Sequence, residues 1–202
     1  MPDKYGVLQD KYCYPGTDVL VNLLHIQDPD VLAEAEAEFT AVRFQTYQST
    51  IRPLQDFTLE HLQFLHFHLF QDLYSWAGEI RDVDLAKGTT RFCINSRIQA
   101  EASKCFRQLP MLNTLVSHDE RVHHVADLFC ELNLIHPFRD GNGRAQRFFF
   151  EELLFALGYE LTWPKISQDD WVAANIAGVA LHLAPLQAIF QQAISTKRIS
   201  NN

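Results

Sequence analysis

One stretch of the chain gathers side chains suited to acid–base and phosphate chemistry. His136 has an imidazole that, unperturbed, exchanges its proton near neutral pH. Asp140 offers a hard carboxylate oxygen of the kind that Mg²⁺ takes beside nucleotide phosphates. These two residues belong to the run His136-Pro137-Phe138-Arg139-Asp140-Gly141-Asn142-Gly143-Arg144, which continues to Arg147.

The second half of this run predicts an anion-binding turn. Gly141 and Gly143 lack a Cβ, so the backbone can turn sharply and approach a ligand. Asn142 is a suitable N-cap for a helix that starts at Gly143 and Arg144. The free N–H groups and the positive dipole end of a helix N-terminus favour phosphate. Arg144 and Arg147 are three residues apart, so we expect them to share a helix face beside that site.

A base, a metal ligand and a phosphate site next to each other leave three reactions open. These are hydrolysis of a phosphate compound, phosphoryl transfer and nucleotidyl transfer. The alternative is a plain loop with a satisfied histidine and a capped, salt-bridged helix start. The combination of all these residues in one order favours the functional interpretation.

Composition indicates the class of protein that carries this site and excludes some binding partners. The 202 residues suit one packed domain, with 47% hydrophobic and 12% aromatic residues. A formal net charge of −8 argues against general binding to nucleic acid or anionic membranes. The polar start of the chain and the lack of a long apolar run predict neither a signal peptide nor a membrane span. Scattered cysteines predict free, buried thiols in a reducing cytosol: Cys13, Cys93, Cys105 and Cys130.

The pattern along the chain predicts an all-α protein, a helical bundle around a central buried helix pair. Capping boxes are expected at Ser96-x-x-Gln99 and Ser117-x-x-Glu120, and a further helix start at Ser167-x-x-Asp170. The helix after Arg144 is apolar almost all round, which indicates a buried, central position. The expected helices cover residues 17–24, 31–47, 59–77 (capped by Thr58 and ended by Gly78), 96–109, 121–134, 144–157, a segment from 167 that includes Trp171 and Asn175, and 183–197.

Residues 80–94 are the exception to this helical pattern. Two short extended runs flank Lys87-Gly88-Thr89-Thr90, which predicts a single β-hairpin. It is either a surface link between helices or a functional edge with unpaired N–H and C=O groups. The histidines His61, His66, His68, His123 and His124 lack metal-ligand spacing, so we interpret them as packing or surface residues.

The run from His136 to Arg147 resembles the signature of the Fic family of nucleotidyl transferases. Weaker similarity extends over about residues 14–190, so the resemblance implies one Fic domain over 1–202. The implied fold is the helical Fic fold, with the hairpin at about 80–94 as its flap and 136–147 as its signature loop. The implied reaction transfers AMP from ATP to a hydroxyl of a target protein and releases pyrophosphate.

The resemblance also implies roles for single residues. His136 would be the general base for the target hydroxyl, and Asp140 would hold Mg²⁺ between the α- and β-phosphates. The turn Gly141-Asn142-Gly143 would bind α- and β-phosphate oxygens, Arg144 the β-phosphate and Arg147 the γ-phosphate. The flap, Lys87-Gly88-Thr89-Thr90 and the strand after it, would border the nucleotide and align the target by strand addition. Trp171 and Asn175 would line the nucleoside side, or would only pack.

Regulation is implied by a missing motif. Many Fic proteins carry an inhibitory helix with Ser/Thr-x-x-x-Glu-Gly/Asn. Here the run Ser75 to Glu79 has the spacing but continues with Ile80, and lies before the flap. The chain therefore resembles the class inhibited in trans by a small helical antitoxin, with a Glu near Arg147. The opening Tyr14-Pro15-Gly16-Thr17-Asp18 resembles short bacterial toxins of this family, whose usual targets are the ATPase subunits of DNA gyrase and topoisomerase IV.

Two other functions stay open from the sequence. One is a related enzyme with another donor, such as UMP or phosphocholine transfer, or one that removes AMP. The other is a nucleotide-binding regulatory module without turnover. The presence of both His136 and Asp140 weighs against the second, because phosphate binding alone needs only the turn and the arginines. We expect a cytoplasmic enzyme that contacts neither DNA nor a membrane.

Overall fold

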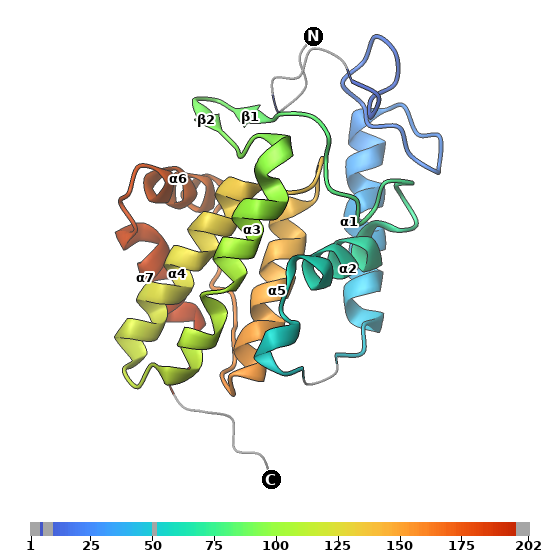
Figure 1. Cartoon of the computed structure of the whole chain (residues 1–202). Coiled ribbons are helices and arrows are strands. Elements are labelled where there is room, and N and C mark those ends of the chain that lie inside the picture. The colour runs from blue at the N-terminus through green and yellow to red at the C-terminus, as the bar shows by residue number, and fades with distance from the viewer. Residues whose placement is uncertain (1–4, 6–9, 50–51, 197–202) are drawn as a thin grey trace.

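The computed structural model describes residue 5 and residues 10–49 and 52–196, and this part is mainly helical (Figure 1). Its helices are α1 (Pro29–Thr46), α2 (Leu59–Phe70), α3 (Ile98–Phe106), α4 (His118–Ile135), α5 (Asn142–Ala156), α6 (Gln168–Val179) and α7 (Ala184–Ala193). Short 3₁₀ helices cover Leu54–Asp56, Asn95–Arg97 and Leu109–Thr114. Strands β1 (Ala86–Lys87) and β2 (Thr90–Arg91) form one antiparallel hairpin.

Helices α4 and α5 pack against each other in the middle of the bundle (Figure 1). Helix α2 packs on α5, whereas α3, α6 and α7 pack on α4, and α1 lies against α2. The central pair carries buried residues on several sides because both helices are covered by neighbours, among them Val125, Phe129, Phe149, Phe150 and Leu153. The expected all-α bundle around a central pair is confirmed.

Capping residues determine several helix starts as the sequence indicates. Thr58 accepts a hydrogen bond from the His61 N–H, and Ser167 accepts one from the Asp170 N–H. At Ser117 the full capping box forms, with Glu120 returning to the backbone N–H of Ser117. Each cap satisfies a backbone donor that would have no partner within the helix.

Three of the helix predictions are wrong in position or extent. Residues 17–24 form turns and an isolated bridge between Cys13 and Leu20, not a helix. The helix expected over 59–77 ends at Phe70, and the apolar residues after it pack from turns instead. Gly78 still ends this segment, with φ of +80°. The helix expected at 183–197 covers only Ala184–Ala193, and residue 197 lies outside the described residues.

The capping box expected at Ser96 is also wrong. Ser96 lies inside the 3₁₀ helix Asn95–Arg97, and α3 begins later without a side-chain cap. The carboxylate of Asp84 accepts hydrogen bonds from both the backbone N–H (2.7 Å) and the side-chain amide (2.9 Å) of Asn95. Asp84, two residues before β1, thus accepts from the backbone N–H of Asn95. A local sequence pattern does not predict this contact.

The hairpin is shorter than residues 80–94, with Ala86 opposite Arg91 and Lys87 opposite Thr90. Gly88 takes φ of +59° at the first position of the two-residue turn, which a side chain with a Cβ disfavours. All four cysteines are free, three of them buried and Cys93 half-buried. None of the helices in the described part is long and apolar enough to cross a bilayer.

Candidate active site

The site begins where α4 ends. His136 is the C-cap residue of α4 and adopts a left-handed conformation, with φ of +47°. Pro137 follows and cannot continue the helix. The backbone turn is held by the buried Arg81, whose Nε donates to the His136 carbonyl at 2.8 Å and whose backbone N–H donates to the Pro137 carbonyl at 2.9 Å. A non-glycine residue with positive φ persists only where its surroundings fix it, and such residues cluster at functional sites.

The hydrogen bonds of the imidazole define which nitrogen can accept a proton. Nδ1 of His136 lies 3.1 Å from the carbonyl oxygen of Asn133. Because a carbonyl can only accept, Nδ1 carries the hydrogen and Nε2 keeps its lone pair. Burial lowers the pKa of His136 to about 3, despite the hydrogen bond to Asn133. The ring stacks on Phe92 of the hairpin segment, with centroids 3.8 Å apart. The geometry therefore presents a neutral imidazole with a defined acceptor nitrogen.

The loop between α4 and α5 is closed by Asn142. Its Oδ1 accepts from the Phe138 backbone N–H and its Nδ2 donates to the Phe138 carbonyl, both at 2.8 Å. Asn142 is thus the first residue of α5, and the expected N-cap role is wrong: Gly141 occupies the N-cap without a side-chain hydrogen bond. The helix start keeps backbone donors that no side chain caps, which suits an anion.

The two glycines of the loop serve different purposes. Gly141 has φ of +75°, and a Cβ there would come within 2.4 Å of the buried Phe70 ring and 3.0 Å of His66 Nε2. Gly143 has ordinary helical geometry, and a Cβ there would meet only the Arg147 guanidinium, at 3.7 Å. Gly141 is therefore required by the packing of the protein, whereas Gly143 leaves open space at the helix start.

His66 supports the loop from below. Its Nδ1 accepts from the Gly78 backbone N–H and its Nε2 donates to the Asp140 carbonyl, both at 2.9 Å. The ring stacks on Phe138, with centroids 3.9 Å apart. Burial lowers the pKa of His66 to about 4, so this ring stays neutral and structural. The interpretation of His66 as a packing residue is confirmed, and His61 is likewise buried against Glu152, at 2.7 Å.

Asp140 offers the carboxylate expected for a metal. Its Oδ1 accepts from the Gly141 N–H at 2.6 Å, and the residue is buried. Within the described residues no group of three or more acidic, histidine or cysteine side chains could hold a metal ion. A single carboxylate is a suitable protein ligand for Mg²⁺, because at nucleotide sites this ion usually takes its other ligands from phosphate oxygens and water.

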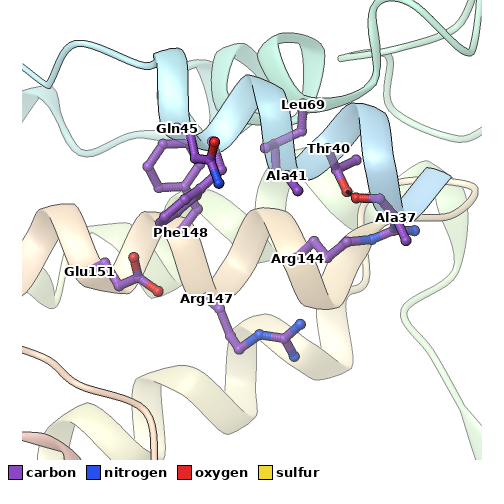
Figure 2. Close-up of a pocket in the computed structure, with 10 residues that line it drawn as sticks. Ala37, Thr40, Ala41, Gln45, Leu69, Arg144, Arg147, Phe148 and Glu151 are labelled. Carbon is purple, nitrogen blue, oxygen red and sulfur yellow. Dashed lines mark hydrogen bonds between the residues drawn. The ribbon is translucent and has the colours of Figure 1, made fainter. Parts of the chain in front are cut away.

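The two arginines extend in different directions from α5, although both line a second cavity of about 280 Å³ beside α1. The expectation that they act together on one phosphate chain stays a prediction. Arg144 reaches toward α1 (Figure 2). There it forms an ion pair with Glu36, Nη2 to Oε2 at 2.5 Å. The Tyr74 hydroxyl also donates to Glu36. Arg147 points away from α1 (Figure 2). Its guanidinium lies over the Trp171 ring, 5.7 Å from the centroid. Residues three apart share a helix face, but long side chains from one face can extend to opposite sides.

A cavity of about 720 Å³ opens at the point where these elements meet. It brings together His136, the helix start at Gly143, Arg147, Trp171 and Asn175. A histidine base and a cationic phosphate site therefore share one space. Arg144, Asp140, Gly141, Asn142 and Thr89 do not line it. The predicted residues in its wall are Lys87, Gly88, Thr90, His136, Gly143, Arg147, Trp171 and Asn175.

Asn133 connects the base to the far side of this cavity. Its Nδ2 donates to Oδ1 of Asn175 at 3.1 Å, while its carbonyl holds His136. Asn175 in turn donates to the Trp171 carbonyl at 2.8 Å. Asn175 and Trp171 thus bind each other and also line the cavity. A packing role and a contact with the nucleoside are therefore compatible for both residues.

The hairpin is fixed to α4 by contacts that the sequence did not indicate. Arg81 donates to the carbonyls of Val83 and Cys93 at the two sides of the hairpin stem, both at 2.5 Å. The Cys93 N–H donates to the Leu134 carbonyl at 2.9 Å. Sequence reasoning missed Arg81, Asn133, Phe92, Tyr5 and Glu36. Arg81 stands in the sequence among the acidic residues Glu79, Asp82 and Asp84, so nothing in the local pattern marks it as a buried residue of the site.

Comparison with known proteins identifies the family of this chain. The Fic/DOC family profile matches residues 56–154. The chain is 42% identical over 98% of its length to "Probable protein adenylyltransferase Fic" of Salmonella typhimurium, covering 98% of that protein. It is 39% identical over 96% of its length to the Escherichia coli protein of the same name, covering 97% of it.

A solved structure extends this comparison to three dimensions. The crystal structure of BepC of Bartonella tribocorum, with bound AMPPNP, superimposes with a TM-score of 0.80 and 27% identity. The match covers 93% of this chain and 97% of BepC. The helical fold with one small hairpin is therefore a fold that occurs with a bound nucleotide analogue in a related protein. The chain belongs to the Fic/DOC family, and its relatives place it among the nucleotidyltransferases.

Proposed function

We propose that this chain is a protein adenylyltransferase that transfers AMP from ATP to a hydroxyl group of a target protein. The observation that carries the proposal is the shared cavity: a neutral histidine, a helix start without a side-chain cap and the half-buried Arg147 line one space. Phosphate binding alone has no need of the oriented histidine. The names of the relatives from Salmonella and Escherichia coli support the same activity.

His136 would act as the general base. The target hydroxyl would donate its hydrogen bond to Nε2, because Nδ1 is occupied by the Asn133 carbonyl. The hydroxyl oxygen then attacks the α-phosphorus, its proton passes to Nε2, and the bond from the α-phosphorus to pyrophosphate breaks. The negative charge of a bound triphosphate favours the imidazolium that forms, which offsets the effect of burial on the imidazole.

The phosphates would bind at the start of α5. Backbone N–H groups of the turn 141–143 and the helix dipole would hold the α- and β-phosphate oxygens and the charge that develops on them. Arg147 would contact the γ-phosphate from the cavity wall. Burial, and next the charge of Arg144, lower the pKa of Arg147, so an anion there would relieve an unfavourable environment. Arg144 would contact the β-phosphate only after it exchanges its ion pair with Glu36.

Asp140 fits as the protein ligand of a Mg²⁺ ion that accompanies ATP. When bound, this ion neutralises phosphate charge and orients the α- and β-phosphates. The remaining work falls to the chain itself. The hairpin would present the unpaired edge of its short strands to an extended segment of the target, with Lys87, Gly88, Thr89 and Thr90 beside the nucleotide. Trp171 and Asn175 would contact the nucleoside.

Transfer is tested by incubating the protein with α-labelled ATP, Mg²⁺ and a bacterial lysate. We expect label on a protein band with the wild type, and a loss of about 10²- to 10⁴-fold with His136→Ala, because general base catalysis is removed. His68→Ala is the matched control, since His68 is a half-buried histidine that binds the Arg43 carbonyl, in another part of the molecule. Label only from another nucleotide would replace ATP as the donor. Tight ATP binding without transfer would identify a regulatory module instead.

We further propose that the chain is a single Fic domain that acts in the cytoplasm as the toxin of a toxin–antitoxin pair. The absence of a complete inhibitory motif in the sequence supports control by a second protein, whose Glu would pair with Arg147. The favoured targets are the ATPase subunits of type II topoisomerases, in keeping with the similarity at Tyr14 to Asp18. Expression of the wild type should then arrest growth, whereas His136→Ala should not. Labelling of purified gyrase ATPase subunit would support this target, and labelling of a different lysate protein would exclude it.

A further inference from the structure

A tyrosine from the start of the chain lies at the base. The Tyr5 hydroxyl is 3.4 Å from Nε2 of His136. Because Nδ1 of this histidine donates to Asn133, Nε2 is the acceptor and the phenol is the donor. The Tyr5 ring meets the edge of the His136 ring at 5.6 Å and that of Phe92 at 6.2 Å, and the residue is 7% exposed. Tyr5 thus makes the hydrogen bond that the mechanism assigns to the hydroxyl of a target.

The main chain of Tyr5 also contacts the hairpin. The Ala86 N–H donates to the Tyr5 carbonyl at 3.1 Å. Ala86 belongs to β1, whose other edge pairs with β2. A backbone hydrogen bond to the outer edge of a short strand is the contact by which an extended peptide adds to a sheet. Side chain and main chain of Tyr5 therefore both take the positions expected for an acceptor segment.

A buried ion pair binds Asp10 to the signature loop. Asp10 Oδ2 accepts from Nε of Arg139 at 2.9 Å, and both side chains are almost fully buried. Arg139 lies within the signature loop, three residues after His136. Breaking a buried pair is strongly unfavourable, because the remaining charge loses its partner. Asp10, five positions after Tyr5, is therefore bound to the loop that carries the base.

We infer that Tyr5 is an intramolecular acceptor, so that the enzyme attaches AMP to its own Tyr5. This inference rests on the proposed adenylyltransferase activity. The Tyr5 oxygen would form a bond to the α-phosphorus of ATP while the bond from that phosphorus to the β-phosphate oxygen breaks. The phenolic proton would pass to Nε2 of His136, and pyrophosphate would leave with the electron pair. The product is a phosphodiester between Tyr5 and AMP, with no oxidant or further reactant required.

Two consequences follow for the acceptor site. A hydroxyl held at the base before ATP arrives is oriented in advance, which gives intramolecular transfer a large advantage over a target in dilute solution. Tyr5 and a target hydroxyl also need the same nitrogen of His136, so only one of them can react at a time. Removal of the Tyr5 hydroxyl should therefore raise labelling of an added target.

The modified residue is identified by incubating the purified full chain with α-labelled ATP and Mg²⁺ and mapping the label by peptide mass spectrometry. We expect one added AMP on Tyr5 in the wild type and none in Tyr5→Phe, which keeps the ring against Phe92. Tyr12→Phe is the matched control, because Tyr12 is another buried tyrosine whose hydroxyl binds Asp82 at 3.0 Å. That variant should keep the label on Tyr5. Circular dichroism and thermal unfolding check that both variants fold.

A mixing experiment tests whether transfer is intramolecular. His136→Ala keeps Tyr5 but lacks the base, whereas Tyr5→Phe keeps the base but lacks the acceptor. In a mixture of the two, the inference predicts that His136→Ala stays unlabelled at Tyr5. Labelling of that chain by its neighbour would overturn the intramolecular arrangement.

The lysate assay separates the failure of this inference from failure of the proposed function. A wild type that labels a lysate protein but leaves Tyr5 unmodified would overturn the inference and leave the adenylyltransferase proposal intact. A wild type that labels neither would overturn both. Label on Tyr5 together with increased labelling of the lysate protein by Tyr5→Phe is the result expected.

Discussion

The signature divides into residues that hold the loop and residues that face the cavity, and both glycine and arginine occur in each kind. Gly141 is pressed against Phe70 and His66, and Arg144 is paired with Glu36 of α1. Gly143 and Arg147, two and three residues further on, line the cavity with His136. Two glycines or two arginines that lie close in the sequence can therefore have different roles, one in holding the loop and one in lining the cavity.

The comparison indicates how the chain keeps a reactive loop in one conformation. The holding residues use packing and hydrogen bonds inside the protein, so their loss should appear mainly as lost stability. Gly143 and Arg147 make few contacts with the rest of the described residues, so their loss should appear mainly as lost activity. Variants at matched positions can break this division or sharpen it.

The largest effect is expected from Gly141→Ala. The left-handed φ and the 2.4 Å approach to Phe70 together should lower the free energy of unfolding by about 2–5 kcal/mol. Urea unfolding followed by circular dichroism measures this loss. Gly143→Ala is the control and should unfold at the same urea concentration or higher, because its Cβ meets no crowded atom. Equal destabilisation by both variants would contradict the division.

The next effect in size is expected from Arg147→Gln. Its kcat/KM for ATP should fall by about 10²-fold, because a charged contact to phosphate is lost at the transition state. The thermal unfolding temperature should barely change, since within the described residues Arg147 forms no ion pair and only lies over Trp171. Arg144→Gln should lose less activity and more stability. A larger loss of kcat/KM in Arg144→Gln than in Arg147→Gln would show that Arg144 is the principal phosphate ligand.

A smaller effect is expected from Glu36→Gln. This change removes the carboxylate charge that holds Arg144 away from the cavity but keeps an oxygen for the Tyr74 hydroxyl. The KM for ATP should fall by roughly two- to tenfold, the range of a partly exposed ion pair, with kcat little changed. Ala37→Ser, at the next position of α1, controls for disturbance of the helix. A higher KM in Glu36→Gln would show instead that Glu36 positions Arg144 for the nucleotide.

The smallest change in signal is expected from the titration of His136 between pH 8 and pH 5. Burial holds the pKa of His136 at about 3, so its imidazole should stay neutral between pH 8 and pH 5 and its ¹⁵N chemical shifts should not titrate. His136→Ala assigns the signals. The unfolded chain, by contrast, takes up protons below pH ~6.5, so stability should decline as pH falls from 6.5 toward 3. A His136 that titrates near 6.5 would mean that the ring is open to solvent before ATP binds.

Local sequence chemistry predicts the parts of the fold that depend on local contacts. Thr58, Ser117 and Ser167 cap helices as expected, because an N-cap bond joins residues two or three apart. Ser96 does not, because Asp84 from the hairpin binds the same turn. The all-α class, the central pair and the hairpin could be predicted because apolar periodicity and the turn at Gly88 are strong signals.

In the site, too, local sequence patterns do not predict contacts between residues that are far apart in the chain. The signature residues are contiguous, so their chemistry is readable from the sequence. The partners that give each one its environment come from elsewhere: Asn133 from the preceding helix, Arg81 from the hairpin stem, and Glu36 from α1. No spacing rule connects Glu36 to Arg144, which lie 108 positions apart. The distinction between holding and facing residues therefore required the structure.

The transfer reaction itself is tested most directly by the position of the label in ATP. Parallel incubations with α-labelled and γ-labelled ATP, each with Mg²⁺ and lysate, distinguish the three reactions that the residues alone leave open. Our account predicts protein-bound label from the α-position only, with pyrophosphate released in equal amount. Protein-bound label from the γ-position would indicate phosphoryl transfer, and free phosphate without protein label would indicate hydrolysis. Either result would contradict nucleotidyl transfer at His136.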